Sequence, residues 1–148
     1  MDLLHPDSVL VPLRATDREA AISLLVDVLR LPGGPADCAP LKAALLAREA
    51  AGSTGIGNGV AIPHARSPKI SAPLLAVGLT ARPIDFKSAD GKPVSLVFLL
   101  AVPNAMPSSH LKILAALSRL ASDKKLLPLL KGATYPDELY NLLAPHPI

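Results

Sequence analysis

Apolar and polar residues follow a helical period soon after the chain begins. The four residues from Thr16 to Glu19 have the form of a capping box, in which side-chain oxygens satisfy free amide groups at a helix start. Apolar residues then recur every three or four positions, at Ile22, Leu25, Val26 and Leu29. Because this spacing places them on one face, the pattern predicts a first helix that ends near Leu31.

A second helical stretch follows the prolines and glycines at 32–35, which cannot continue the first helix. Asp37 can cap this second helix, and Leu41 and Leu45 share its apolar face. Gly52 is expected to end it, since glycine commonly follows the last turn of a helix. Arg48 is therefore expected in the last turn.

Three stretches have the pattern of β-strands. Residues 60–62 form a short one, and residues 74–79 and 94–102 form two longer ones separated by a Gly-Lys-Pro turn at 91–93. The stretch 94–102 scarcely alternates between apolar and polar residues, so we expect it to be buried on both faces.

The last third of the chain is predicted to be helical. Ser108 or Ser109 can cap a helix that has His110 in its first turn and the apolar face Leu111, Leu114, Leu117 and Leu120. Asp123 can cap a short helix, and a last helix is expected to begin near Pro136. Strands and helices interleave along the chain, which predicts an α/β fold: a single-domain layered sandwich.

Composition limits the class of protein. We expect one domain over residues 1–148, of which about 3–143 form the folded core. Its hydrophobic interior is expected to be aliphatic, because half of the residues are hydrophobic but only 3% are aromatic. The single Cys38 permits no intrachain disulfide and no cysteine pair for zinc, which favours a reducing compartment. No secretory signal is recognised, and the longest apolar run is about half of the roughly 20 residues that a membrane helix needs. We therefore expect a cytoplasmic protein without membrane insertion.

Charge gives little support to a nucleic-acid partner. The net charge is only +3, and the basic residues are scattered without aromatic side chains on which bases could stack. Nucleic-acid binding is therefore not expected.

The most unusual segment is the loop at residues 52–59, in which four of eight residues are glycine. Such a run is usually kept where the backbone turns sharply or approaches another group closely, as in a phosphate-binding loop. The loop is not a Walker loop, because Gly59 is not followed by Lys and Ser or Thr. A dinucleotide-binding fingerprint is excluded as well, because position 60 is Val and a strand follows the loop rather than a helix.

The loop and the short strand after it lead to His64, which follows the rigid Pro63 and precedes Arg66. A neutral imidazole is nucleophilic near physiological pH, and a phosphohistidine is a reactive phosphoryl donor. A phosphoryl group in transfer spreads negative charge over its oxygens, so cations and N–H donors are expected around it. The loop amides, Arg48 and His110 are the candidates.

These residues also carry a resemblance to a known family. Arg48-Glu49, followed by residues 52–64, resembles the signature of the fructose/mannitol-type enzyme IIA domains of the bacterial phosphotransferase system. The stretch from His110 to Leu117 resembles the second histidine motif of that family, and a weaker likeness extends from about Leu3 to Leu143. Within the family, the chain most resembles the nitrogen-regulatory enzyme IIA subgroup.

The resemblance implies a mixed, mainly parallel sheet flanked by helices, and a phosphoryl carrier without a cofactor. It implies that His64 takes phosphate, through Nε2, from a phosphohistidine on an HPr-like carrier, with His110 beside it and Arg48 neutralising the phosphoryl oxygens. The expected phosphoryl loop comprises Ser53, Thr54, Gly55, Gly57, Asn58 and Gly59. The proline-rich stretch 102–107 departs from the family pattern, so the resemblance supports the position of His110 in the site less strongly than that of His64.

Alternatives remain open at this point. His64 can be read as a structural imidazole, or as a metal ligand together with His110, although no ligand spacing supports a metal site. For the function, three classes compete: a regulatory switch that binds a target protein, a sugar-pathway carrier that passes phosphate to a transporter IIB domain, and a binding module that never turns over. The chain length, which leaves no room for a fused transporter domain, favours the regulatory switch.

We predict that His110→Ala slows phosphoryl transfer to the chain without unfolding it, because a residue at the start of a helix carries little of the core. The rate of labelling by a phosphorylated HPr-like carrier, with circular dichroism as the folding control, checks this. A wild-type rate in the variant would remove His110 from the site.

Overall fold

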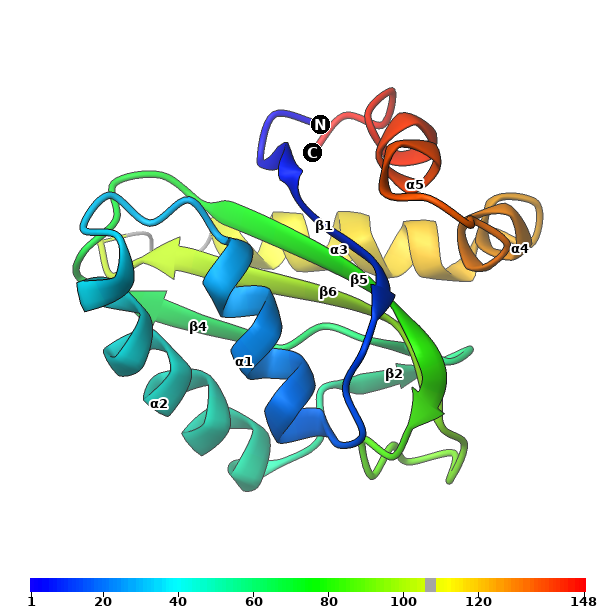
Figure 1. Ribbon diagram of the computed structural model, residues 1–148, viewed down its shortest axis with the longest axis horizontal. Coiled ribbons are helices and arrows are strands. Elements are labelled where there is room, and N and C mark those ends of the chain that lie inside the picture. Colours follow the sequence, from blue (N-terminus) through cyan, green and yellow to red (C-terminus); the bar gives the residue numbers. More distant parts are fainter. Residues whose placement is uncertain (106–108) are drawn as a thin grey trace.

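One six-stranded sheet separates two layers of helices in the computed structural model, which describes residues 1–105 and 109–148 (Figure 1). The strands are β1 (Leu4–Leu13), β2 (Gly55–Gly57), β3 (Val60–Ala61), β4 (His64–Ser67), β5 (Leu74–Ile84) and β6 (Val94–Pro103). The helices are α1 (Arg18–Val28), α2 (Pro35–Ala51), α3 (Ser109–Ser122), α4 (Leu126–Lys131) and α5 (Pro136–Leu143).

The sheet is mixed, as predicted. Its strand order is β1-β5-β6-β3-β2. Strand β4 also pairs with β6, at residues 100–103, whereas β3 pairs with Leu96 and Val97. Among the described strands, β1–β5, β3–β6 and β4–β6 pair in parallel, whereas β5–β6 and β2–β3 are antiparallel. The predicted α/β layered sandwich is therefore confirmed.

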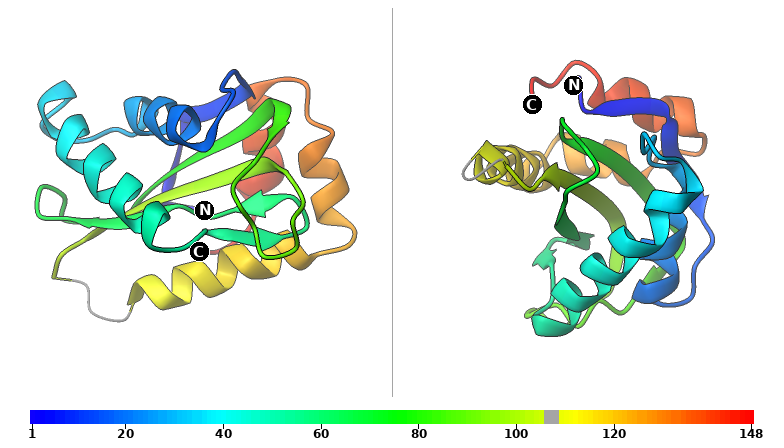
Figure 2. Two further views of the ribbon diagram at one scale, coloured as in Figure 1. Left: turned by 90° about the horizontal axis from the view of Figure 1, so that it is seen from below. Right: turned by 90° about the vertical axis from the view of Figure 1, so that its left-hand side faces the viewer.

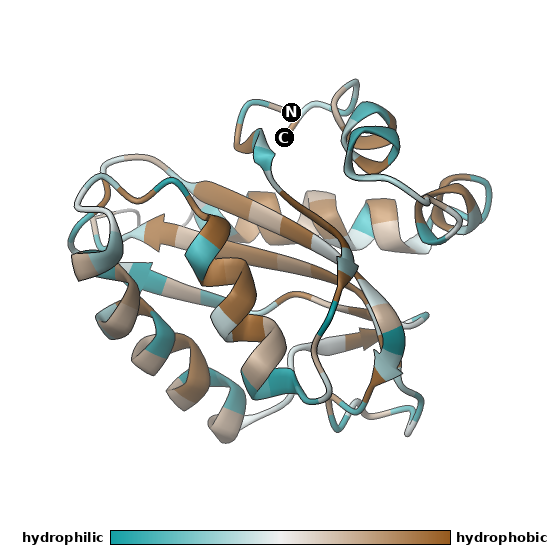
Figure 3. Ribbon diagram, in the orientation of Figure 1, coloured by the Kyte–Doolittle hydropathy of each residue, from teal (hydrophilic) through white to brown (hydrophobic). Residues whose placement is uncertain are grey.

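Strand β6 divides the core between the two layers. Because successive side chains of a strand point to opposite faces, its residues alternate between two apolar clusters. Phe98 and Leu100 pack with the side chains of α3, α4 and α5, and Val97 and Leu99 pack with those of α1 and α2. The right-hand view of Figure 2 shows α3 (yellow) on one side of the sheet and α1 and α2 (blue and cyan) on the other. Burial of this strand on both faces is confirmed, and Figure 3 shows its hydrophobic colour along the centre of the fold.

The helix starts differ from the predictions in detail. Asp17 rather than Thr16 is the N-cap of α1, and its carboxylate accepts the Ala20 N–H at 2.7 Å. The helix ends at Val28, three residues before the predicted end. Asp37 is not the cap of α2 but lies in its first turn, where its carboxylate accepts the Gly33 N–H at 2.9 Å.

Helix α2 begins at Pro35 because a proline is tolerated in the first turn, where its missing N–H would have no helical partner. The helix ends at Ala51 with Gly52 as its C-cap, and Arg48 lies in its last turn as predicted. Asp123 accepts the N–H groups of Lys125 and Leu126 at 2.9 Å each, at the entry to α4.

Strands β1, β2 and β4 were not predicted. Two prolines and a broken alternation hide β1 in the sequence, and its register with β5 is irregular, as expected of a proline-containing edge strand. Strand β4 is four residues long and begins at His64 itself. The register that places β4 comes from β6, far along the chain, so no local pattern announces it.

The apolar face of α3 is rotated from the prediction. Ile113, Leu117, Leu120 and Ala121 are buried in the core. Leu111 is instead 57% exposed, and Leu114 is only partly buried. The predicted capping side chains of Ser108 and Ser109 lie outside the described residues.

The close approach of β5 to α1 and β1 generates a stability prediction. A Cβ on Gly78 would lie 2.7 Å from Leu13 Cδ2 and 3.1 Å from Leu25 Cδ2, and both leucines are fully buried. Gly78→Ala should therefore lower the free energy of unfolding by about 1–3 kcal/mol through overpacking. Urea denaturation followed by circular dichroism measures this.

Gly52→Ala is the matched control, because the backbone there is extended and nothing lies within 4 Å of the added carbon. Its unfolding free energy should stay within about 0.5 kcal/mol of wild type or rise slightly. Equal stability of the two variants would show that this packing account is wrong.

Candidate functional site

Strand β4 fixes the backbone that carries His64. His64 pairs in register with Leu100 of β6, and the Leu100 N–H donates to the Pro63 carbonyl at 2.9 Å. The backbone of His64 is therefore paired with a strand that is buried on both faces. The residue itself is half-buried.

One hydrogen bond determines which nitrogen of the imidazole is available. His64 Nδ1 lies 2.8 Å from the carbonyl oxygen of Ile62. A carbonyl oxygen only accepts hydrogen bonds, so Nδ1 carries the proton in the neutral ring. Nε2 is then the nitrogen with the free lone pair.

The electrostatic surroundings keep this ring neutral. Burial lowers the pKa of His64 below its ordinary value of 6.5, against the Ile62 hydrogen bond, which raises it. The positive charge of Arg48 and the nearby His110 lower the pKa further, whereas Glu49 raises it. A neutral, nucleophilic imidazole therefore prevails at physiological pH.

His64 lines a cavity of about 250 Å³. The residues around it come from α2, the glycine loop, the segment after β3 and α3: Arg48, Ser53, Thr54, Ile56, Ile62, Leu114 and Ser118. One guanidinium and three hydroxyl-bearing residues thus share a cavity with the imidazole. The Ser53 and Thr54 hydroxyls already donate their protons, to the Phe86 carbonyl and the Glu49 carboxylate. Arg48 and Ser118 are therefore the lining side chains suited to donate to phosphoryl oxygens.

The start of the glycine loop is held by side chains rather than by helix or sheet. The Arg48 guanidinium donates to the Gly52 carbonyl at 2.8 Å. The Ser53 hydroxyl donates to the Phe86 carbonyl and accepts the Gly55 N–H at 3.0 Å. The end of α2 and the loop therefore form one hydrogen-bonded unit beside His64.

The tip of the loop lies apart from this cavity. Gly57, Asn58 and Gly59 all have positive φ, which the turn between β2 and β3 requires. The Asn58 amide donates to the Ala121 carbonyl at 3.3 Å, and Lys131 donates to the Asn58 carbonyl. These two contacts tie the tip of the loop to α3 and α4. Asn58 and Gly59 line a separate hollow of about 480 Å³ rather than the cavity of His64.

His110 and Arg66 form a second group near the site. Arg66 Nη2 lies 3.4 Å from His110 Nδ1, and its Nη1 donates to the Asn104 carbonyl at 3.3 Å. His110 is not among the residues that line the cavity, but it is close enough for its charge to lower the pKa of His64.

Four residues that line the cavity are not in the predicted site. Ser118 and Leu114 come from α3, four residues apart, Ile56 comes from the loop, and Ile62 follows β3. Leu114 was predicted to be core, and nothing in its sequence neighbourhood distinguishes it from Leu117. Leu114 and Ser118 reach the cavity because α3 packs on the face of the sheet opposite α1 and α2.

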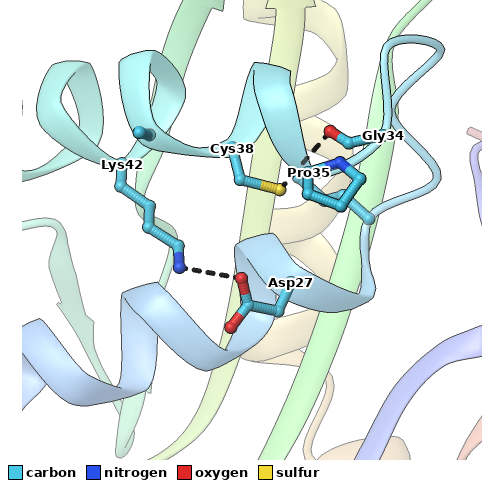
Figure 4. A pocket seen from close by; sticks show the side chains of 7 residues that line it. Asp27, Gly34, Pro35, Cys38 and Lys42 are labelled. Carbon is cyan, nitrogen blue, oxygen red and sulfur yellow. Dashed lines mark hydrogen bonds and ion pairs between the residues drawn. The ribbon is translucent and has the colours of Figure 1, made fainter.

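A larger hollow, of about 540 Å³, lies between α1 and α2 and contains no histidine (Figure 4). Lys42 and Asp27 form an ion pair of 2.7 Å across it, and the Cys38 thiol lies 3.8 Å from the Gly34 carbonyl. These polar groups are already paired with one another. Size alone therefore does not select the functional site.

Within residues 1–105 and 109–148, no group of three or more His, Cys, Asp or Glu side chains is arranged to hold a metal ion. No helix in the described part of the chain is long and apolar enough to span a membrane.

The geometry of His64 and its cavity agrees with a comparison of the sequence with protein families. The family described as "Phosphoenolpyruvate-dependent sugar phosphotransferase system, EIIA 2" matches residues 2–145. The chain belongs to this EIIA type 2 family. It is therefore a phosphoryl-carrier domain of the phosphotransferase system, and the family predicted from residues 48–64 is confirmed.

Individual relatives of this EIIA domain include regulatory and sugar-specific proteins. The chain is 36% identical over 143 residues to a nitrogen regulatory protein of Bradyrhizobium diazoefficiens, covering 97% of this chain and 93% of that protein. The crystal structure of nitrogen regulatory protein IIA-Ntr from Neisseria meningitidis has a TM-score of 0.87 at 30% identity, covering 96% and 97% of the two chains. Enzyme IIAMTL of Escherichia coli, in a complex with phosphorylated enzyme IIBMTL, shares the fold with a TM-score of 0.77 at 19% identity, covering 97% and 99%.

The electrostatics of the site generate a titration prediction. Removing the positive charge of Arg48 removes one cause of the lowered pKa, so Arg48→Ala should raise the pKa of His64 toward 6.5. The ring protons of His64, followed by NMR across a pH titration, give the value directly.

Arg82→Ala is the control for a general change of charge, because Arg82 lines a different hollow with Arg14. It should leave the titration of His64 unchanged. A pKa that falls in Arg48→Ala, or that shifts equally in both variants, would contradict this account of the site.

Proposed function

We propose that His64 accepts a phosphoryl group on Nε2 from a phosphohistidine of an HPr-like carrier, and that the phosphorylated chain acts as a regulatory signal. The observation that carries the proposal is the 2.8 Å contact of His64 Nδ1 with the Ile62 carbonyl, which leaves Nε2 unprotonated. The lowered pKa of His64 keeps that nitrogen nucleophilic.

The transfer needs no cofactor. The lone pair of Nε2 forms the new N–P bond while the N–P bond of the donor breaks, and its electron pair returns to the donor's ring nitrogen. Nδ1 keeps its proton, so the product ring gains positive character. The Ile62 carbonyl stabilises that charge through the hydrogen bond that it already makes.

Groups around the cavity suit the charge of the phosphoryl oxygens. Arg48 lies at the cavity with its guanidinium anchored to the Gly52 carbonyl, and Ser118 lines the same space. Fixed donors of this kind stabilise a developing negative charge without reorganising during the reaction. They also bind the phosphohistidine after transfer.

The rim of the site suits a protein donor. Ile56, which lines the cavity, is 43% exposed, and Arg66, which lies 3.4 Å from His110, is exposed as well. An apolar group and a cation beside the imidazole fit the docking of a partner protein.

The regulatory role is supported by the relatives. The nitrogen regulatory protein of Bradyrhizobium diazoefficiens and IIA-Ntr from Neisseria meningitidis match this chain over nearly their whole lengths. Phosphorylation adds about two negative charges to the surface at His64, enough to change binding to a target protein. In this role the chain acts in the cytoplasm, where the thiol of Cys38 stays reduced.

Transfer to a transporter IIB domain is the second candidate. It is favoured by the likeness to enzyme IIAMTL, whose structure was determined in a complex with phosphorylated enzyme IIBMTL. The two candidates share the phosphorylation of His64 and differ in the later fate of the phosphoryl group.

The first step is tested by incubating the purified chain with a phosphorylated HPr-like carrier and locating the added phosphate by mass spectrometry under non-acidic conditions. We expect one phosphate, on His64, and none on His64→Ala. His5→Ala, a change of an exposed histidine on β1, should be labelled at the wild-type rate. Absence of label on the wild-type chain, or unchanged label in His64→Ala, would refute the proposal.

Adding a fructose- or mannitol-type IIB domain to the labelled chain separates the two candidates. Phosphate that stays on the chain favours the regulatory signal. Rapid transfer to the IIB domain favours the sugar-pathway carrier.

A further inference from the structure

Glu49 occupies a position that is costly for a carboxylate. Its side chain is only 2% exposed, so its charge is removed from water. It also lies in the last turns of α2, where the helix dipole disfavours negative charge. A buried carboxylate at this end of a helix requires contacts that offset both the loss of water and the helix dipole.

Those contacts join two distant parts of the chain. Glu49 Oε2 accepts the backbone N–H of Thr54 at 2.9 Å, and Oε1 accepts the Thr54 hydroxyl at 2.5 Å. Arg18, at the start of α1, places its Nη1 3.6 Å from Oε2 and is itself largely buried. The carboxylate is thus paired and hydrogen-bonded, and its strongest contacts are to the glycine loop.

The hydrogen bonds continue from Thr54 to the imidazole. The Thr54 carbonyl accepts the Ile62 N–H at 3.0 Å, and the Ile62 carbonyl lies 2.8 Å from His64 Nδ1. Two residues, each bonded through both its N–H and its carbonyl, therefore connect the buried carboxylate to the ring. Hydrogen bonds arranged in series polarise and align one another.

We propose that Glu49 is a positioning residue for His64: by fixing Thr54, and through it Ile62, it holds the carbonyl that keeps the proton on Nδ1 and leaves Nε2 free. Glu49 does not touch the phosphoryl group. Its role rests on the proposed function of His64, and its effect on the ring can be measured without any phosphate donor.

The competing explanation is local. Pro63 stands between Ile62 and His64 and restricts the backbone there, so the proline alone could orient the Ile62 carbonyl. In that case Glu49 would only stabilise the end of α2. The two explanations differ in what happens to the ring when Glu49 is changed.

The test compares Glu49→Gln, Glu49→Asp and Glu49→Ala. Glutamine keeps the length of the side chain and an oxygen that accepts the Thr54 N–H, although it loses the charge that faces Arg18. Aspartate keeps the charge but withdraws the carboxylate by one methylene group. If position matters, Glu49→Gln should behave like the wild type, and Glu49→Asp like Glu49→Ala.

The first readout is the tautomer of His64 in chain labelled with ¹⁵N-histidine, from long-range ¹H–¹⁵N spectra at a pH where the ring is neutral. We expect the Nδ1–H form in the wild type and Glu49→Gln, and a mixture of both forms in Glu49→Asp and Glu49→Ala. Amide spectra of each variant report whether it is folded, and the folded variants decide the test. A ring that keeps the Nδ1–H form in Glu49→Asp overturns the proposal, as does a mixture of both forms in Glu49→Gln.

The second readout is labelling by the phosphorylated HPr-like carrier. The maximal rate should fall by about tenfold or more in Glu49→Asp, the size of effect seen for outer partners that orient a metal-binding imidazole, with the donor concentration for half-maximal rate unchanged. Recovery in Glu49→Gln is expected. Equal maximal rates in the wild type and a folded Glu49→Asp variant would overturn the proposal. A wild-type chain that takes no label would instead refute the role of His64 and leave the tautomer result standing.

Discussion

The hydrogen bond between His64 Nδ1 and the Ile62 carbonyl is the interaction on which the chemistry of this domain depends. It assigns the proton to one nitrogen and the lone pair to the other, and in the proposed transfer it would support the positive character of a ring that carries phosphorus on Nε2. Burial and the charge of Arg48 act in the same direction, because both favour the neutral ring before transfer. The nucleophile is thus prepared by a backbone carbonyl rather than by a catalytic carboxylate.

The fold holds that carbonyl and its surroundings in place from several directions. Strand β6 fixes the strand that begins at His64, and the end of α2 holds the start of the glycine loop and presents Arg48. Helix α3 covers the other side with Leu114 and Ser118 and is tied to the tip of the loop through Asn58. Residues separated by about half of the chain therefore build one small cavity. Glycine suits the loop because Gly57 and Gly59 have positive φ and a Cβ on Gly55 would clash with Ser88.

The sequence was sufficient for the parts of this arrangement that local patterns encode. The glycine loop, the last-turn position of Arg48 and the doubly buried strand β6 were all predicted, because capping, periodicity and turn residues are short-range signals. Strand β1 was missed because its prolines break the alternation, and β4 because its partner β6 is far along the chain. Ser118 was missed because a serine on a helix gains significance only from what the helix packs against.

The most direct test of the central claim is to establish which ring nitrogen of His64 carries phosphorus. Chain labelled with ¹⁵N-histidine and phosphorylated by an HPr-like carrier should show ³¹P–¹⁵N coupling at Nε2, with a proton still on Nδ1. Coupling at Nδ1 would contradict the account, because that nitrogen would have had to release the Ile62 carbonyl before it could react.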